Sequence, residues 1–393
     1  MKKLCLIFLS LCLLLPSITL PIYGEEKKQQ ESSGELAASA KGVYLCENTT
    51  GKVIYARNEK EKLYPASMTK MMGLLLIFES LHDGKLQWDD SVTTSEYAAS
   101  MGGSQVFLEV GETMSVEDMV KSICIASAND AMVAMGEKIG GTTEGFVEMM
   151  NEKAKELKLE NTHFMNPTGL HDPDHYSCAK DMAIIARALI KEGKEDLLKI
   201  TSTYDAYIRE DSDAKFWLVN TNKLLKQYPG VDGLKTGFTT EALSCITTTA
   251  KKDGLRLIGV VMGEPSSKVR NKEMIQLLDY GFSQYEQSVL YKKGTTIQTQ
   301  KVENGKPDTV DLVTMEDAVY VYQKGSTPKE TKKEIILEQK ELPYHKGKKI
   351  GHMKIEMSDG YTMQIDIAAG QDIAPLNFLD IFMKTFEDIF VNS

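Results

Sequence analysis

Two regions with different secondary-structure patterns follow one another along the chain and limit its fold. Residues 66–285 mix amphipathic helical segments with strand-like segments, whereas short strand-like runs separated by Gly, Pro and Asp turns fill the chain from about residue 288. A chain of 393 residues is long enough for two domains. We therefore expect an α/β domain at residues 39–287 and a small all-β domain of meander or sandwich type at residues 288–374.

Several segments of the first region have well-defined local patterns. The stretch "GVYLCENTTGKVIYARN" (residues 42–58) alternates apolar residues around a Thr-Gly turn and predicts a β-hairpin. Residues 115–140 predict a helix that begins with a capping box at Ser115 and is interrupted near residues 127–129. Residues 242–263 predict two strands joined at Asp253-Gly254.

The N-terminal 38 residues carry the pattern of an export signal followed by a polar leader. Residues 1–24 begin with Lys2 and Lys3, continue as an apolar run and end at the small residue Gly24. This order is typical of a secretory signal peptide, with cleavage expected near Gly24. Residues 25–38 are polar and predict a disordered leader. We therefore expect the mature protein to be exported.

Charge and cysteine content argue against several function classes. The formal net charge is -10 and becomes about -12 when the two signal-peptide lysines are removed. Because phosphate-driven binding needs a basic face, we expect no nucleic-acid partner. Four cysteines follow the leader, widely spaced and without a C-x-x-C pattern, and they predict buried free thiols, with one disulfide as the open alternative: Cys46, Cys124, Cys178 and Cys245.

The C-terminal segment, residues 375–393, predicts an amphipathic helix. Its apolar face contains Phe378, Leu379, Phe382, Met383, Phe386, Ile389 and Phe390. Two interpretations stay open: a helix lying on a membrane surface, or a helix packed on its own domain or on a partner. The polar face is net acidic, which weakens the membrane interpretation because anionic lipid repels it.

A serine and a lysine stand three residues apart at the start of an apolar helix. They are Ser67 and Lys70, in the stretch "YPASMTKMMGLLLIFESL". The S-x-x-K pattern alone is weak, since it recurs at residues 177–180, where Ser177 is interpreted as a helix N-cap, and at residues 326–329, in a Pro-containing loop.

Two further motifs follow Ser67 in order: the S-x-N Ser127-Ala-Asn129 and the K-T-G Lys235-Thr236-Gly237. This ordered set is typical of penicillin-binding proteins and serine β-lactamases. With the stretches "GGSQVFLEVGE", "NTHFMNPTGLHDPDHYSCAKDMA" and "GVDGLKTGFT", the chain resembles the low-molecular-mass D-alanyl-D-alanine carboxypeptidases over about residues 40–375. The resemblance implies a β-lactamase/transpeptidase-like domain, with an antiparallel sheet flanked by helices, before the all-β domain.

The resemblance also implies a role for each motif residue. Ser67 would attack the substrate carbonyl, and Lys70 would take the hydroxyl proton if burial or a second cation such as Lys235 lowers its pKa. Ser127 would relay a proton to the leaving amine. The expected substrate-binding residues are Asn129, Lys235, Thr236, Gly237, the backbone N–H of Phe238, Thr239 and Arg270. Arg270 has a surface arginine as its alternative interpretation.

Two local features bear on cofactors and specificity. The His171-Asp-Pro-Asp-His175 segment invites a metal interpretation, but Pro173 disfavours the helix that a zincin site needs, so we expect neither metal nor cofactor. The family commonly has Gly in the stretch after Thr239, where this chain has "TEALSC". We expect Leu243 to affect rate or substrate preference.

These observations predict a serine-type D-Ala-D-Ala carboxypeptidase, at the extracytoplasmic face of a bacterium, with peptidoglycan stem peptides and β-lactams as ligands. A class A β-lactamase needs a Glu in an E-x-x-L-N loop, and the nearest stretch, "EDLLKI" from Glu195, lacks the Asn. An endopeptidase that cuts peptide cross-links shares the three motifs and stays open. A catalytically idle wall protein, in which Ser67 only caps a helix, is the alternative from another class.

Overall fold

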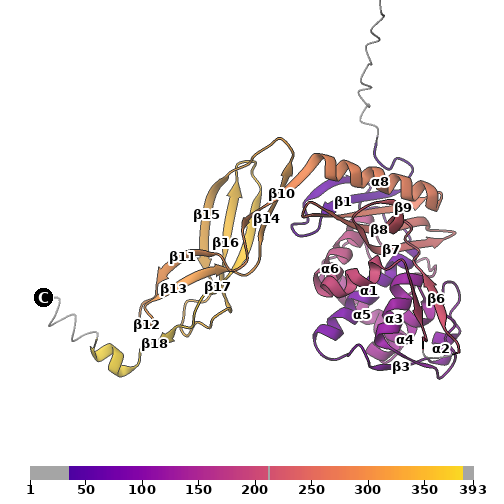
Figure 1. Ribbon diagram of the computed structural model, residues 1–393, viewed down its shortest axis with the longest axis horizontal. Coiled ribbons are helices and arrows are strands. Elements are labelled where there is room, and N and C mark those ends of the chain that lie inside the picture. The colour runs from indigo at the N-terminus through magenta and orange to yellow at the C-terminus, as the bar shows by residue number, and fades with distance from the viewer. Residues whose placement is uncertain (1–34, 211–212, 384–393) are drawn as a thin grey trace, which may run out of the picture. The chain divides into compact units, whose positions relative to one another are not determined.

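The computed structural model describes residues 35–210 and 213–383 (Figure 1). The predicted signal peptide, most of the predicted leader and residues 384–393 lie outside the described residues. The first region contains β1 (Gly42–Glu47), β2 (Val53–Arg57), the 3₁₀ turn η1 (Ala66–Thr69), α1 (Lys70–His82), β3 (Ser91–Thr93), α2 (Glu96–Ala99), β4 (Thr113–Ser115), α3 (Val116–Lys121), the π turn η2 (Ser122–Ala126), α4 (Asn129–Gly140), α5 (Thr143–Glu156), α6 (Ala179–Ser202), β5 (Asp205–Ile208), β6 (Phe216–Val219), α7 (Leu224–Gln227), β7 (Val231–Thr239), β8 (Leu243–Lys252), β9 (Leu255–Glu264) and α8 (Ser267–Gln284).

A five-stranded antiparallel sheet organises this region, with the strand order β2-β1-β9-β8-β7. Both predicted hairpins belong to it, and Asp253 and Gly254 turn β8 into β9 with the left-handed φ angles, 50° and 87°, of a tight two-residue turn. Strand β7 pairs only with β8 in this sheet and therefore forms its edge.

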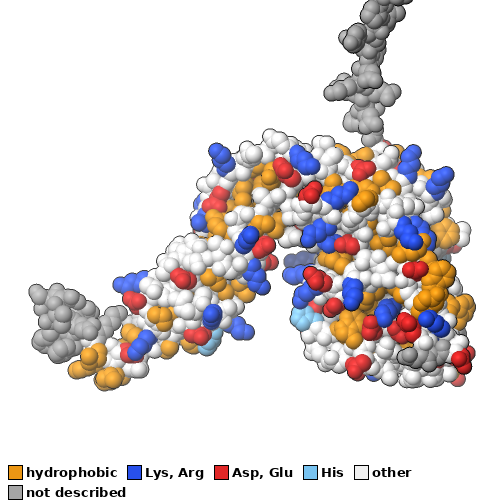
Figure 2. Space-filling model, viewed as in Figure 1, with side chains coloured by type: hydrophobic (Ala, Val, Ile, Leu, Met, Phe, Trp, Pro, Cys, Tyr) orange, Lys and Arg blue, Asp and Glu red, His pale blue; other side chains and the backbone are white. Residues whose placement is uncertain are grey.

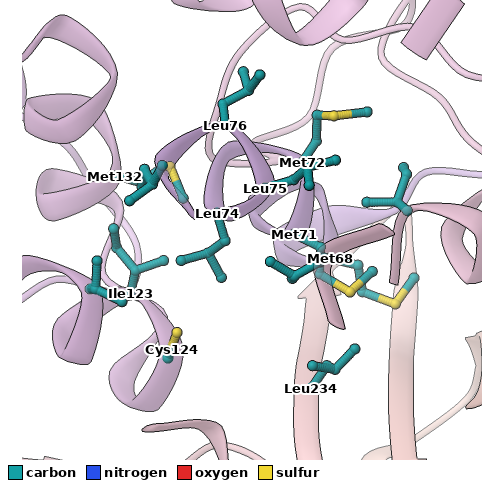
Figure 3. Packing of buried hydrophobic residues seen from close by; sticks show 14 of the residues in the cluster. Met68, Met71, Met72, Leu74, Leu75, Leu76, Ile123, Cys124, Met132 and Leu234 are labelled. Carbon is teal, nitrogen blue, oxygen red and sulfur yellow. The ribbon is translucent and has the colours of Figure 1, made fainter. Parts of the chain in front are cut away.

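Helices cover both faces of the sheet, each through its own hydrophobic core. One core joins the sheet to α1, α3, α4, α5 and α6, and Figure 3 shows its centre, where Met68 and Met71 lie beside Leu234 of β7. The other core packs α8 on the opposite face through Met274, Leu277 and Leu278. Because α1 is buried over most of its length, its first turn is held rigidly next to the edge strand.

Two helix starts test the capping predictions. Ser115 caps α3 as predicted, since its side chain accepts a hydrogen bond from Asp118 N. The prediction for Ser177 is wrong. The cap of α6 is Cys178, whose sulfur accepts from Asp181 N, while the Ser177 hydroxyl lies 2.8 Å from Thr162 Oγ1.

The C-terminal region is an all-β domain, as predicted. Its strands are β10 (Tyr285–Tyr291), β11 (Thr296–Lys301), β12 (Gly305–Lys306), β13 (Thr309–Thr314), β14 (Ala318–Gln323), β15 (Glu330–Leu337), β16 (Lys349–Met357), β17 (Thr362–Ala369) and β18 (Ala374–Pro375). Five of them form a sheet with the order β11-β13-β17-β16-β15, and β10 pairs with β14. The fold class expected from the sequence is confirmed.

The described part of the C-terminal segment is a short helix at residues 378–383. Its apolar side chains are exposed, Phe378 by 85% and Leu379 by 66%, and Figure 2 shows hydrophobic side chains gathered beside the last described residues. The rest of the predicted amphipathic helix lies outside the described residues. Over residues 35–210 and 213–383, no helix is both long and apolar enough to span a bilayer.

The cysteines agree with the sequence-based expectation of buried free thiols. Acidic and basic side chains are interspersed over the face seen in Figure 2, without a large patch of one sign. Cys46, Cys124, Cys178 and Cys245 are all buried and free. Burial raises the pKa of the Cys124 thiol to about 12, which keeps it protonated near neutral pH.

Candidate active site

Ser67 and Lys70 meet at the start of the buried helix α1. Ser67 lies in the turn η1, one residue after Ala66, which has a φ of 47°. Lys70 is the first residue of α1 and is fully buried. Its Nζ lies 3.0 Å from Ser67 Oγ. The three-residue spacing thus places the hydroxyl and the amine in direct contact.

Two carbonyl oxygens hold the other side of the Lys70 amine. Nζ donates to Asn129 Oδ1 at 2.6 Å and to the backbone oxygen of Thr168 at 2.8 Å. Burial lowers the pKa of Lys70 well below its ordinary value, and the charge of Lys235 lowers it further. Asp130 acts in the opposite direction, but the net pKa shift is downward.

Thr168 is a site residue that the sequence analysis missed. Its carbonyl position depends on a tight loop in which Asn166 Oδ1 accepts from the backbone N–H groups of Thr168 and Gly169. Gly169 has a φ of 82°, and a Cβ there would lie only 1.9 Å from Ala66 O. The contact uses a backbone oxygen, so no side-chain motif marks it in the sequence.

His175 holds the serine turn η1 through a side-chain hydrogen bond to Thr69. Met165 N donates to its Nδ1 at 3.1 Å, so the ring proton is on Nε2, which donates to Thr69 Oγ1 at 2.8 Å. Burial lowers the pKa of His175 to about 4, and the ring is neutral at pH 7. Across the described ranges, no three His, Cys, Asp or Glu side chains are grouped as metal ligands.

The S-x-N motif lies at the break between the π turn η2 and α4. Ser127 has a φ of 64°, and its buried Oγ meets no hydrogen-bond partner among the described residues. Asn129, besides accepting from Lys70, donates through Nδ2 to Gly102 O at 2.6 Å and through its backbone N to Ser104 O at 2.7 Å. The side chain of Asn129 therefore already has partners on both sides.

Asp130, the residue after the motif, fixes the loop that faces it. Its fully buried carboxylate accepts hydrogen bonds from the backbone N–H groups of Val106, Leu108 and Ala131. A buried carboxylate with three N–H donors is a strong anchor. Asp130 was not among the predicted site residues, because its role depends on burial and backbone contacts that only the folded chain shows.

The K-T-G motif lies on the edge strand β7. Lys235 is buried, its Nζ donates to Thr236 O at 3.0 Å, and burial lowers its pKa to about 7. The Thr236 hydroxyl donates to Thr221 Oγ1 at 2.8 Å. A Cβ at Gly237 would lie 2.8 Å from Pro65 O and 3.1 Å from Ser67 N, so the absence of a side chain lets β7 approach the serine turn.

The remaining predicted residues lie around β7. Phe238 is 66% exposed, and Thr239 Oγ1 accepts from Ala242 N in the turn that follows the strand. Leu243 begins β8 in a left-handed conformation, with a φ of 58°, which Gly adopts more readily than a residue with a side chain.

Arg270 is buried at the start of α8, so its interpretation as a surface arginine is wrong. Its guanidinium donates to Asn271 Oδ1 at 2.8 Å and to Cys245 O at 3.3 Å. Burial lowers its pKa to about 10. The positive charge of Arg270 is close enough to contribute to the lowered pKa of Lys235.

Comparison with known families matches both regions of the chain. Residues 26–266 match the family model described as D-alanyl-D-alanine carboxypeptidase. Residues 285–375 match the model described as penicillin-binding protein 5, C-terminal domain. The two matches together span both of the domains that the structure contains.

Individual relatives are similar over most of their length. The chain is 48% identical to the D-alanyl-D-alanine carboxypeptidase DacF of Bacillus subtilis over 363 residues, which cover 92% of this chain and 93% of that protein. A crystal structure of penicillin binding protein 5 from Haemophilus influenzae is 33% identical, with a TM-score of 0.70, over 86% of this chain and 98% of that one. Penicillin-Binding Protein D2 from Listeria monocytogenes in the ampicillin bound form is 29% identical over 62% of this chain and 98% of that one, with a TM-score of 0.56. The chain therefore belongs to the D-alanyl-D-alanine carboxypeptidase family.

Proposed function

We propose that the protein removes the terminal D-alanine from peptidoglycan stem peptides through an acyl-enzyme on Ser67. The observation that carries this proposal is the contact between the Ser67 hydroxyl and a fully buried Lys70 amine. A serine hydroxyl is a weak nucleophile at its ordinary pKa and needs an adjacent base. Among the described residues, Lys70 is the basic group whose nitrogen lies within hydrogen-bond distance of Ser67 Oγ.

The three contacts of Lys70 Nζ support its role as the base. A neutral amine has two N–H bonds and one lone pair. Asn129 Oδ1 and Thr168 O are pure acceptors and take the two N–H bonds. The lone pair then points at Ser67 Oγ and can accept its proton as the oxygen attacks the carbonyl carbon. The lowered pKa of Lys70 favours this neutral form.

The developing oxyanion is proposed to lie between two backbone N–H groups, those of Ser67 and Phe238. The close approach at Gly237, next to Ser67 N, supports this because it brings the following residue of β7 to the serine turn. Ser127 Oγ is proposed to pass the proton on to the leaving amine of D-alanine. Its buried hydroxyl has no partner among the residues described, and a substrate amine would supply one.

The terminal carboxylate is proposed to bind where Lys235, Thr236 and Arg270 concentrate positive charge and hydroxyl donors. Two buried cations at this end of β7 are costly without an anion, which a substrate carboxylate supplies. The substrate backbone would pair with the free edge of β7 and with Asn129. After D-alanine leaves, water attacks the ester on Ser67 and releases the shortened peptide and the free serine.

Two alternative functions, a class A β-lactamase and an endopeptidase, are compared with this proposal. The Glu195 of the nearest E-x-x-L-N-like stretch is exposed on α6, which disfavours the deacylation chemistry of a class A β-lactamase. An endopeptidase would use the same site on a cross-linked peptide. For localisation, we propose export to the extracytoplasmic face of a bacterial membrane, with the exposed apolar helix at residues 378–383 as the membrane contact.

Labelling by a fluorescent penicillin tests the acyl-enzyme. We expect one covalent label, located by mass spectrometry on the peptide that contains Ser67, and none in Ser67→Ala. The control is Ser326→Ala, which removes the serine of another S-x-x-K pattern in an exposed loop and should keep the label. Equal labelling of Ser67→Ala and the unmodified protein would contradict the proposal, and the absence of label in both would favour the idle wall protein.

A further inference from the structure

A short segment before β1, residues 36–41, packs onto the α/β domain, and we call it the strap. Ala37 and Ala40 of the strap are buried in the hydrophobic core that holds α8 on the sheet. Its backbone is also bonded to two strands. Arg57 Nη2, on β2, donates to Ala37 O at 2.5 Å and to Ala40 O at 2.7 Å, and Lys41 N donates to a backbone oxygen of β9 at 2.8 Å. The catalytic proposal makes no use of this segment.

One side chain of the strap, Ser39, lies against two carboxyl groups. Its Oγ is 2.6 Å from Glu264 Oε2, at the end of β9, and 2.7 Å from Glu273 Oε1, on α8. Glu264 is fully buried. The second oxygen of each carboxyl group is buried too, and no N–H or O–H group of another described residue donates to it. The two carboxyl groups are instead hydrogen-bonded to each other.

This closed cluster of three side chains needs a proton. An ionised carboxylate can only accept hydrogen bonds, and the Ser39 hydroxyl has a single hydrogen to donate. With one carboxyl group protonated, its O–H bonds to the other and Ser39 completes the cluster. Burial raises the pKa of Glu264 to about 8, with the hydrogen bond to Glu273 as a second cause. Burial opposes ionisation of Glu273 as well, but hydrogen bonds from Glu264 and Ser39 lower its pKa overall, so the proton resides on Glu264 at neutral pH.

The charged groups around the pair balance one negative charge. Arg57, on β2, acts to lower the pKa of both carboxyl groups, but burial outweighs it at Glu264. Arg270, on α8, is near enough to Glu264 to interact with it electrostatically. The other titratable neighbours are Lys41 and the thiol of Cys245 on β8, whose pKa burial raises to about 11. A second negative charge on the pair would be buried directly beside the first.

We propose that the proton shared by Glu264 and Glu273 latches the strap onto the α/β domain, and that its loss lets the strap detach reversibly while the rest of the domain stays folded. In the detached state Glu264 is solvated, and its pKa returns from about 8 to the ordinary 4.5. The attached state therefore binds the proton more tightly. The latch is strongest below pH 4.5 and is lost as pH rises through 8. This inference is independent of the proposed function.

Amide hydrogen exchange of the full chain, with quenched-flow labelling at pH 6 and pH 9, tests the latch. The readout is the protection factor of the Ala40 and Lys41 amides, whose hydrogen bonds break on detachment. Amides of β8, inside the same sheet, report unfolding of the whole domain. We expect the strap amides to lose protection roughly tenfold or more between the two pH values, while the β8 amides stay more protected than the strap.

Two variants and a control assign the effect to the shared proton. Glu264→Gln supplies an amide donor to Glu273 at every pH, so the strap should keep nearly equal protection at pH 6 and pH 9. Glu273→Gln supplies the same kind of donor from the other side and should also reduce the pH dependence. Glu316→Gln, at an exposed glutamate between β13 and β14, should lose protection as the unmodified protein does.

Three results would overturn the latch. The first is equal protection of the strap at pH 6 and pH 9 in the unmodified protein. The second is an undiminished pH dependence in Glu264→Gln, or in Glu273→Gln if the first variant does not fold. The third is protection of the strap equal to that of β8 at both pH values, because the strap would then open only when the whole domain unfolds.

Discussion

The Nζ atom of Lys70 lies 3.0 Å from Ser67 Oγ and is held from its other side by two carbonyl oxygens. This arrangement fixes the direction of the amine lone pair, not only its distance from the hydroxyl. A lysine that only balanced a surface charge would be exposed and free to rotate. The contact therefore connects the protonation state of Lys70 to the reactivity of Ser67.

The acid limb of the pH profile should follow Lys70. Only neutral Lys70 can accept the proton, so the acylation rate should rise as pH rises through the lowered pKa of Lys70. Lys235→Met removes a cation that lowers this pKa and should move the limb to higher pH. Asp130→Asn removes an anion that raises it and should move the limb to lower pH. Stopped-flow acylation by excess penicillin measures both shifts, and identical limbs in the two variants would contradict the assignment.

The alkaline limb should follow Lys235. Its pKa is about 7 in the free protein, so the charge available for the substrate carboxylate is lost as pH rises above that value. We expect kcat/KM, which reports the free enzyme, to fall above pH about 7. Lys235→Arg keeps the charge, and the decline should move to above pH about 9. An unchanged decline in Lys235→Arg would assign that limb to another group.

Gly237→Ala should damage both stability and acylation. The added Cβ would lie 2.8 Å from Pro65 O and 3.1 Å from Ser67 N, and these backbone atoms cannot rotate away. Overpacking of this kind costs about 1–3 kcal/mol, and separating β7 from Ser67 should slow acylation at least tenfold. The control for stability is Gly102→Ala, where an added Cβ meets nothing within 4 Å. A melting temperature and acylation rate equal to those of the unmodified protein would show that β7 can move aside.

His175 should make the fold sensitive to acid. Its pKa is about 4 when folded and near 6.5 when unfolded, so the unfolded state binds the proton first. The stabilisation is complete above pH 6.5 and is lost as pH falls toward 4, by about 3 kcal/mol in total. Urea unfolding at pH 7 and pH 4.5 should show a smaller loss in His175→Asn. The control is His345→Asn, at an exposed histidine. Between pH 7 and pH 4.5 it should lose as much stability as the unmodified protein loses.

Sequence patterns predicted the elements of this fold better than its local contacts. The alternation in residues 42–58 and the Asp253-Gly254 turn are determined by neighbouring residues, so both hairpins were predictable. The predicted Ser177 cap was wrong because α6 begins one residue later. Cys178 has the extended backbone that an N-cap needs. Which of two adjacent residues becomes the helix cap depends on tertiary packing.

The same limit applies to the site. Ser67, Lys70, Asn129 and Lys235 could be identified because their side chains form ordered motifs, and the structure brings the first three into direct hydrogen-bond contact. Thr168 contributes a backbone oxygen, which every residue type has, so the sequence does not mark this position. Asp130 and Thr221 act by holding other groups, and such supporting contacts depend on the folded arrangement.

The most direct test of the account is D-alanine release from a peptide ending in D-Ala-D-Ala, measured for the unmodified protein and for Ser67→Ala side by side. We predict steady release by the unmodified protein and none by the variant, with both equally folded by circular dichroism. Equal release by both would contradict the assignment of Ser67. No release by either, with penicillin labelling of Ser67 intact, would contradict the carboxypeptidase activity and favour an endopeptidase acting on cross-linked peptides.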